Sequence, residues 1–161
     1  MTTSYSVSGF WRGVIIATTI AGTLDILSAF LFDGLVEGSP LGVLQGIAAA
    51  ACPQFDFGEV ANAGVGLIVH FVIMFAMVAV YFTAAARIGP LNRHPWLSGI
   101  GYGLLLWIVM YWLVLPHRFP TLFPVLAPQE VAIQLFDHIV LVGLPVAWVA
   151  RRAAHWQRLG E

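Results

Sequence analysis

Residues 61–85 read ANAGVGLIVHFVIMFAMVAVYFTAA and contain no Asp, Glu, Lys or Arg. An α-helix needs about 20 predominantly apolar residues to cross the hydrocarbon core of a bilayer, which is about 30 Å thick. This stretch is long enough and apolar enough to do so. It therefore predicts a transmembrane helix.

Three further stretches have the same character, at about residues 11–32, 96–115 and 131–150. The 161 residues are 60% hydrophobic and only 9% charged, with a mean hydropathy of +0.88. A soluble domain carries about 25% charged residues, so this chain could not cover a surface that faces water. The composition excludes a soluble enzyme, a disordered regulator and a free nucleic-acid-binding domain. We expect one all-α domain over residues 1–161, an integral membrane bundle of four transmembrane helices.

The arginines indicate the orientation of the chain. All seven basic residues are arginine, and only Arg118 falls on one side of the predicted membrane. The others flank the span ends on the opposite side: Arg12, Arg87, Arg93, Arg151, Arg152 and Arg158. Because loops rich in Lys and Arg stay preferentially in the cytoplasm, we expect both termini to be cytoplasmic. The first span lacks a clear signal-peptide cleavage motif, and we expect a multi-pass protein of the bacterial inner membrane.

The connection between the first two spans, residues 33–60, is too long for a simple turn. Within it, Ser39-Pro40 is typical of a helix N-terminus, and Pro53 ends the apolar run that follows. The resulting helix, about residues 40–52, is too short to span a bilayer. We expect it on the periplasmic side, either as a lid packed over the bundle, as a gate over an outward-facing cavity, or as a re-entrant segment.

Ionisable residues inside the predicted spans are the candidate functional residues, because such groups are costly at membrane depth. Asp25 lies in the first span, His70 in the second, and the adjacent Asp137 and His138 in the fourth. Each lies about 10 Å from the outer end of its span, so all four are expected at one level in the outer half of the bilayer. With Gln134, one turn before His138, they form the candidate polar cluster. Whether the side chains meet depends on helix rotation, which one sequence does not give.

Three kinds of chemistry would use this cluster. Carboxylates and histidines can pass protons, since histidine titrates near neutral pH. Asp25, His70, Asp137 and His138 could instead bind a divalent metal ion as a mixed nitrogen and oxygen site, and the two histidines could ligate a haem. No known catalytic motif accompanies these residues. The leading interpretation is a non-enzymatic membrane protein with a proton- or solute-linked cluster, and a metal- or haem-binding redox protein is the alternative.

Small residues indicate close helix packing and bear on the expected partners. Gly99 and Gly103 in the third span have the G-x-x-x-G spacing that lets two helices approach closely, and small residues also follow the Asp25 face of the first span. Such faces favour a homo-oligomer, and an accessory subunit of a larger membrane complex is a third functional alternative. The lipid bilayer is the expected surrounding. Without a basic stripe, no nucleic acid is expected as a partner.

Prolines shape two further segments. Residues 116–128 contain four prolines, which predicts a stiff loop on the outer membrane surface. His117 and Arg118 at its start are expected to bind anionic head groups or to pair with the acidic residues of the first outer connection, which are Asp33, Glu37, Asp56 and Glu59. Pro145 is expected to bend the fourth span.

Landmarks spread over most of the chain form a pattern. They are Ala21-Gly22 and Ser28-Ala29-Phe30, then Ser39-Pro40 and Ala49-Ala50-Ala51-Cys52, then His70, Phe75 and Tyr81, and finally Phe136, His138 and Val140 leading to Arg151-Arg152. This pattern resembles the YagU-like family of bacterial inner-membrane proteins. The resemblance implies an inner-membrane protein with a suggested link to acid tolerance, and it singles out His70 and His138. It implies no biochemical activity, and Asp25 is not among the matched landmarks.

Overall fold

The computed structural model describes residues 7–36, 39–54 and 58–156. Four helices in these ranges are long and apolar enough to cross a membrane. The first two are α1 (Val7–Val36) and α3 (Glu59–Arg87). The described residues form helices and loops without any strand, so the predicted all-α bundle of four membrane-spanning helices is confirmed.

The third and fourth spans each contain a π-helical segment. The third consists of α5 (Pro95–Ile108), η1 (Val109–Val114) and α6 (Leu115–Arg118), and the fourth of α7 (Pro128–Phe136), η2 (Asp137–Gly143) and α8 (Leu144–Trp156). Each π segment is followed, one residue later, by a proline: Pro116 after η1 and Pro145 after η2. Proline has no N–H for the carbonyl four residues earlier, which favours a local change of hydrogen-bond pattern. The fourth span, in which a bend was expected at Pro145, has its π segment just before this proline.

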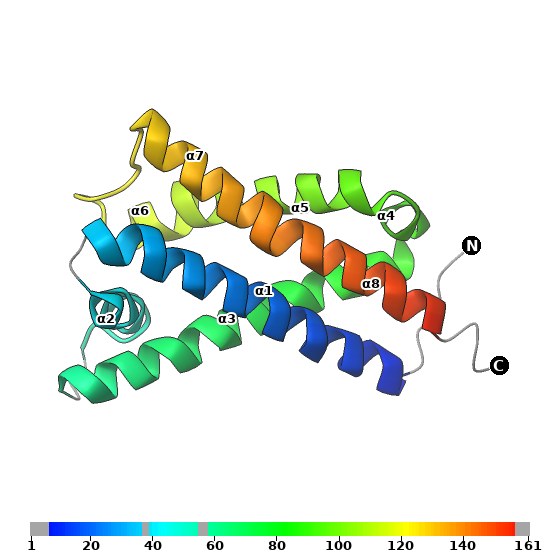
Figure 1. Cartoon of the computed structure of the whole chain (residues 1–161), viewed down its shortest axis with the longest axis horizontal. Coiled ribbons are helices and arrows are strands. Elements are labelled where there is room, and N and C mark those ends of the chain that lie inside the picture. Colours follow the sequence, from blue (N-terminus) through cyan, green and yellow to red (C-terminus); the bar gives the residue numbers. More distant parts are fainter. Residues whose placement is uncertain (1–6, 37–38, 55–57, 157–161) are drawn as a thin grey trace.

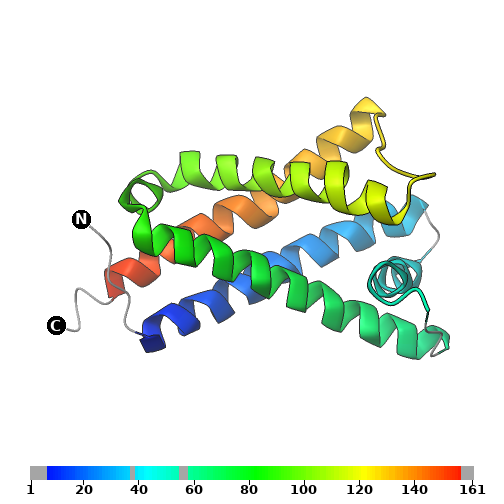
Figure 2. The same ribbon diagram turned by 180° about the vertical axis from the view of Figure 1, so that it is seen from behind.

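The two ends of the bundle differ in what they carry (Figures 1 and 2). The start of α1, the end of α3 and the end of α8 lie at one end, together with α4 (Gly89–Arg93). We name this the arginine end, because its described basic residues are Arg12, Arg87, Arg93, Arg151 and Arg152. At the opposite end, α2 (Pro40–Ala51) lies between α1 and α3, and we name this the α2 end. Glu37, Asp56 and Arg158 lie outside the described residues.

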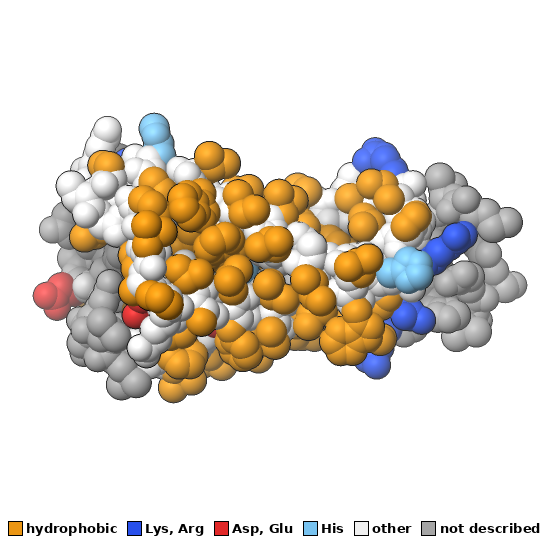
Figure 3. All heavy atoms as spheres, turned by 90° about the horizontal axis from the view of Figure 1, so that it is seen from above, with side chains coloured by type: hydrophobic (Ala, Val, Ile, Leu, Met, Phe, Trp, Pro, Cys, Tyr) orange, Lys and Arg blue, Asp and Glu red, His pale blue; other side chains and the backbone are white. Residues whose placement is uncertain are grey.

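Large apolar side chains cover the outside of the spans. Leu31, Ile68, Leu97 and Phe136, one from each span, are 62%, 66%, 73% and 46% exposed. Figure 3 shows hydrophobic side chains along the middle of one face, with basic side chains toward one end and acidic ones at the other. Such a band would be unfavourable in water but suits hydrocarbon, and it identifies a multi-pass membrane protein.

The best-buried apolar residues join α1, α3 and α8 in the arginine half of the bundle. Val14, Val78, Phe82, Val146 and Ala150 are all fully buried. These contacts fix the three spans relative to one another, while the third span joins the bundle through α8 and η2.

α5 packs against η2 with the two backbones almost in contact. A Cβ atom on Gly103 would overlap the His138 carbonyl oxygen and lie 2.6 Å from Ile139 Cα, and one on Gly143 would overlap the Gly99 carbonyl oxygen. The Gly99 and Gly103 pair is therefore used within the chain, as is the buried stripe of the first span. These faces pack within the chain, and the expected homo-oligomer stays a prediction.

α2 begins and ends close to the predicted bounds of 40–52. The Ser39 hydroxyl accepts a hydrogen bond from the Gly42 N–H at 3.1 Å, which caps the helix as such residues do. A Cβ atom on Gly66 of α3 would overlap the Leu44 carbonyl oxygen, so α2 lies directly on α3. Gly58 turns the chain into α3 with φ +83°, a conformation that glycine adopts without steric cost.

We expect Gly103→Ala to destabilise the protein by about 1–3 kcal/mol, the usual cost of over-packing, because its methyl group would overlap the His138 carbonyl. Gly101→Ala is the matched control, since a Cβ atom there meets no atom within 4 Å. Thermal unfolding of the purified protein in detergent measures both. Equal stability of the two variants would contradict the packing of α5 on η2.

Candidate functional site

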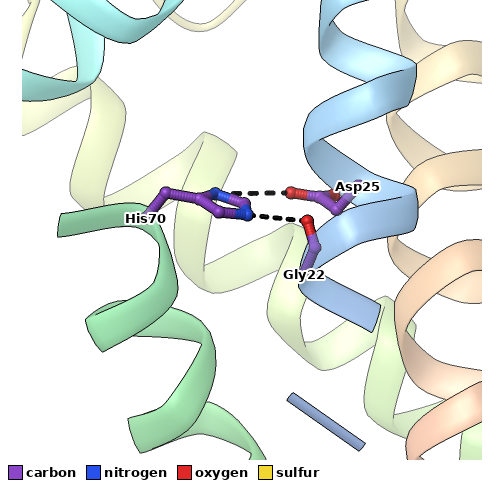
Figure 4. Close-up of polar contacts among 3 residues, drawn as sticks. All are labelled: Gly22, Asp25 and His70. Atoms are coloured by element: carbon purple, nitrogen blue, oxygen red, sulfur yellow. Dashed lines mark hydrogen bonds and ion pairs between the residues drawn. The ribbon is translucent and has the colours of Figure 1, made fainter. Parts of the chain in front are cut away.

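Asp25 on α1 and His70 on α3 point toward each other (Figure 4). His70 Nδ1 lies 3.9 Å from Asp25 Oδ2, and His70 Nε2 lies 2.9 Å from the Gly22 carbonyl oxygen. The side chain of His70 is 8% exposed and that of Asp25 is 24% exposed. A Cβ atom on Gly22 would come within 2.8 Å of the Phe71 ring. The close approach of α1 and α3 at this glycine therefore brings the acid and the histidine together.

The backbone contact of His70 determines where its proton lies. A carbonyl oxygen can only accept, so Nε2 carries the hydrogen and donates it to Gly22. Nδ1 then faces the Asp25 carboxyl group. With a neutral ring and an ionised Asp25, a nitrogen lone pair would face a carboxylate oxygen, which is unfavourable. One proton placed on either partner removes this repulsion, so the pair is suited to hold a single additional proton.

Asp137 is held by a residue of the first span. The Ser28 hydroxyl donates to Asp137 Oδ1 at 2.6 Å, a length typical of a hydroxyl that donates to a carboxylate. Ser28 is only 4% exposed, so this bond joins α1 to η2 inside the bundle. Asp137 lines the same cavity as His70, from the fourth span.

His138 and Gln134 make separate contacts. His138 Nδ1 lies 3.0 Å from the Gln134 carbonyl oxygen one turn earlier, so Nδ1 carries the hydrogen and Nε2 is the remaining acceptor. The Gln134 side-chain oxygen accepts from the Trp107 indole N–H at 3.1 Å, which links the third and fourth spans. The ring of Tyr111 meets His138 edge to face, with centroids 5.6 Å apart. The two histidines are thus held by backbone carbonyls through different ring nitrogens.

A cavity of about 210 Å³ lies among these residues. Asp25, His70, Asp137 and His138 all line it, and Tyr111 adds a hydroxyl-bearing ring from η1. The rest of the lining is largely apolar and includes Met74, Met77 and Met110, with Val43 and Ile47 of α2. The structure therefore brings the four ionisable residues of the candidate cluster to one cavity, which α2 helps to enclose.

Gln134 does not line the cavity but supports it through Trp107 and His138. Sequence reasoning did not single out Ser28 as the partner of Asp137, nor Tyr111 and the methionines as lining residues. The sequence does contain a signal that Ser28 faces the bundle interior, because it lies on the same small and polar helix face as Asp25. Tyr111 had none, since the π-helical turn changes which residues of the third span face inward.

The arrangement does not assemble the metal site considered for Asp25, His70, Asp137 and His138. Within the described ranges, no three His, Cys, Asp or Glu side chains come together so that they could hold a metal ion. Asp137 and His138 are instead bound to Ser28 and to the Gln134 carbonyl, and Asp25 faces His70. The cavity, at about 210 Å³, is smaller than the roughly 300–1,000 Å³ of pockets for drug-sized ligands, so it would have to widen to hold a haem.

Arg118 donates to backbone carbonyl groups of α2, which its charge alone did not predict. Its Nε donates to the Ala50 carbonyl oxygen, and its Nη2 donates to the Ala49 carbonyl oxygen at 3.3 Å. These carbonyls lie in the last turn of α2, where carbonyl groups lack helical partners and the helix dipole is negative. Arg118 therefore fastens α2 to the end of the third span, beside the cavity.

Comparison with protein-family models, with curated proteins and with solved structures gives no significant match for this chain. The YagU-like resemblance therefore stays a prediction. The function must be argued from the cavity and its residues.

We expect His70 to carry its hydrogen on Nε2 and His138 to carry its hydrogen on Nδ1 in the neutral rings. Solid-state ¹⁵N NMR of histidine-labelled protein in lipid at neutral or higher pH distinguishes the two forms. His70→Gln and His138→Gln assign the signals, and the exposed ring of His117, which lines neither cavity, is the internal control. The same ring form at both buried histidines would contradict the contacts described.

We expect Arg118→Gln to loosen α2, because hydrogen bonds to a charged group contribute about 1.5–3 kcal/mol. Hydrogen exchange of residues 40–51 should rise by about ten-fold or more, while exchange in the arginine half of α3 stays unchanged. Arg152→Gln removes the same charge at the other end of the bundle and serves as the control. Unchanged protection of α2 in Arg118→Gln would contradict the role of this arginine.

Proposed function

We propose that this protein is a non-enzymatic protein of the bacterial inner membrane that takes up protons in the cavity lined by Asp25, His70, Asp137 and His138. The observation that carries the proposal is the convergence of these four side chains, from three spans, on one cavity of about 210 Å³. Ionisable residues at membrane depth are costly and generally functional. Four of them around one space are more than packing of the bundle requires.

The proton positions support this chemistry. Each histidine has one nitrogen held by a backbone carbonyl, at Gly22 or Gln134. The other nitrogen remains an acceptor, toward Asp25 at His70. A water molecule occupies about 30 Å³, so the cavity has room for several, with carboxyl and imidazole groups as partners. Water and side chains together form a suitable path for a proton.

The orientation follows from the arginines. By the positive-inside rule, the arginine end faces the cytoplasm, so the cavity lies in the outer half of the membrane and α2 lies on the periplasmic side. There the cavity would take up protons from the outside, with α2 as its lid. The YagU-like resemblance, with its suggested link to acid tolerance, agrees with this placement.

We expect acidification to protonate carboxyl groups that are shielded from bulk water. Infrared difference spectra of the protein in lipid should contain their C=O bands, assigned to Asp25 and Asp137. Asp25→Asn should remove one band and shift the proton affinity of His70, and Asp25→Asn with Asp137→Asn should remove both. In cells, Asp25→Asn and His138→Ala should abolish protection against acid while the protein still accumulates in the membrane.

Glu130→Gln is the matched control, because Glu130 lies in the first turn of α7 and does not line the cavity. It should retain the shielded bands and the protection. Bands that persist in the double variant would contradict proton uptake in this cavity. Failure of Asp25→Asn and His138→Ala to accumulate would show instead that these residues only hold the bundle together.

A further inference from the structure

A second cavity, of about 500 Å³, lies in the arginine half between α3, α4 and α5. Its lining is mostly apolar: Val80, Ala84, Leu91, Leu97, Gly101 and Leu105. Val80, Leu97 and Leu105 are themselves 63%, 73% and 53% exposed. The cavity is therefore a groove open to the side of the bundle, where the membrane supplies lipid. We name it the α3–α5 groove.

The groove is separate from the polar cavity. Tyr102 lines the groove and Met77 lines the polar cavity, and the Tyr102 hydroxyl donates to the Met77 carbonyl oxygen at 2.7 Å. This bond joins α3 to α5 between the two spaces. An inference about the groove therefore does not depend on the proposed uptake of protons.

Two features of the sequence create the groove. Gly101 has no side chain, and a Cβ atom there would meet no atom within 4 Å. The short helix α4 lies between the ends of α3 and α5, and the buried Asn92 side chain fixes it by donating to the Ala85 carbonyl oxygen at 2.8 Å. α4 thus holds the two spans apart at the arginine end, and Gly101 leaves the space between them open.

His94 lines the groove, and two arginines lie beside lining residues at the arginine end of α3 and α4. Val80, Ala84 and Arg87 follow one another at helical spacing, so Arg87 continues the groove-lining face of α3 to its end. His94 lines the groove from the start of α5, and Arg93 precedes it. All three basic residues are exposed. No Asp or Glu occurs between residues 60 and 129, so α4, α5 and the rest of α3 supply no acidic partner for them.

We propose that the α3–α5 groove binds an anionic phospholipid. One acyl chain lies along the apolar lining, and Arg87, Arg93 and His94 hold the phosphate group. Basic pockets between transmembrane helices bind anionic lipid head groups, and arginine forms strong paired hydrogen bonds to phosphate. The apolar lining alone would accept any lipid chain; the basic residues select a lipid with a net negative charge.

Native mass spectrometry of delipidated protein titrated with phosphatidylglycerol, or with phosphatidylcholine of the same chains, tests the proposal. Phosphatidylglycerol should bind at least ten-fold more tightly. Arg87→Gln with Arg93→Gln should weaken its binding by about five-fold for each arginine removed. Arg12→Gln with Arg152→Gln, which removes the same charge at the same end from α1 and α8, should leave binding unchanged. Equal binding of both lipids, or equal loss in both double variants, would overturn the site.

A second pair of variants tests the groove itself. Gly101→Leu fills the space for the acyl chain and should abolish phosphatidylglycerol binding. Gly64→Leu adds the same side chain on α3 where a Cβ atom also meets nothing within 4 Å, and it should bind as wild type does. Unchanged binding by Gly101→Leu would overturn the proposal, as would a second copy of the chain that covers the groove and excludes lipid. If Gly101→Leu fails to fold, the arginine pair alone decides.

Discussion

Polar groups inside hydrocarbon find no water, so they must find partners within the protein. In the α2 half of this bundle three of these partners come from other spans. Ser28 of α1 donates to Asp137 of η2, Trp107 of α5 to Gln134 of α7, and His70 of α3 to the Gly22 carbonyl of α1. His70 and Asp137, which are costly in a membrane, thus join spans, and both line the cavity.

The two proposed functions, proton uptake and lipid binding, lie in different halves of the molecule. In the α2 half, ionisable side chains surround a small cavity that α2 and Arg118 help to enclose. In the arginine half, an apolar core joins α1, α3 and α8, and a lipid-facing groove separates α3 from α5. The Tyr102–Met77 hydrogen bond lies between the cavity and the groove. The proposed sites for protons and for lipid therefore lie at different depths along the bundle.

The sequence could predict the spans, because length and polarity act residue by residue and need no knowledge of neighbours. It could also predict α2, because Ser39-Pro40 is a local signal for the start of a helix. It could predict the common membrane depth of Asp25, His70, Asp137 and His138, because depth follows from counting residues along each helix. It could not predict which side chains meet, since helix rotation and neighbour order depend on packing. The partners of Arg118 could not be predicted for a related reason. They are backbone carbonyls, and the pattern of charged residues indicates only possible side-chain partners.

The proposed uptake of protons depends on the contact between His70 and Asp25, which a distance measurement can detect. Solid-state NMR of protein in lipid, with ¹⁵N-labelled histidine and ¹³C-labelled aspartate carboxyl groups, detects dipolar coupling between His70 Nδ1 and the Asp25 carboxyl carbon, whose Oδ2 lies 3.9 Å from that nitrogen. We predict coupling between the His70 ring and an aspartate that disappears in Asp25→Asn and persists in Asp137→Asn. Absence of this coupling in the wild type, or its persistence in Asp25→Asn, would contradict the account.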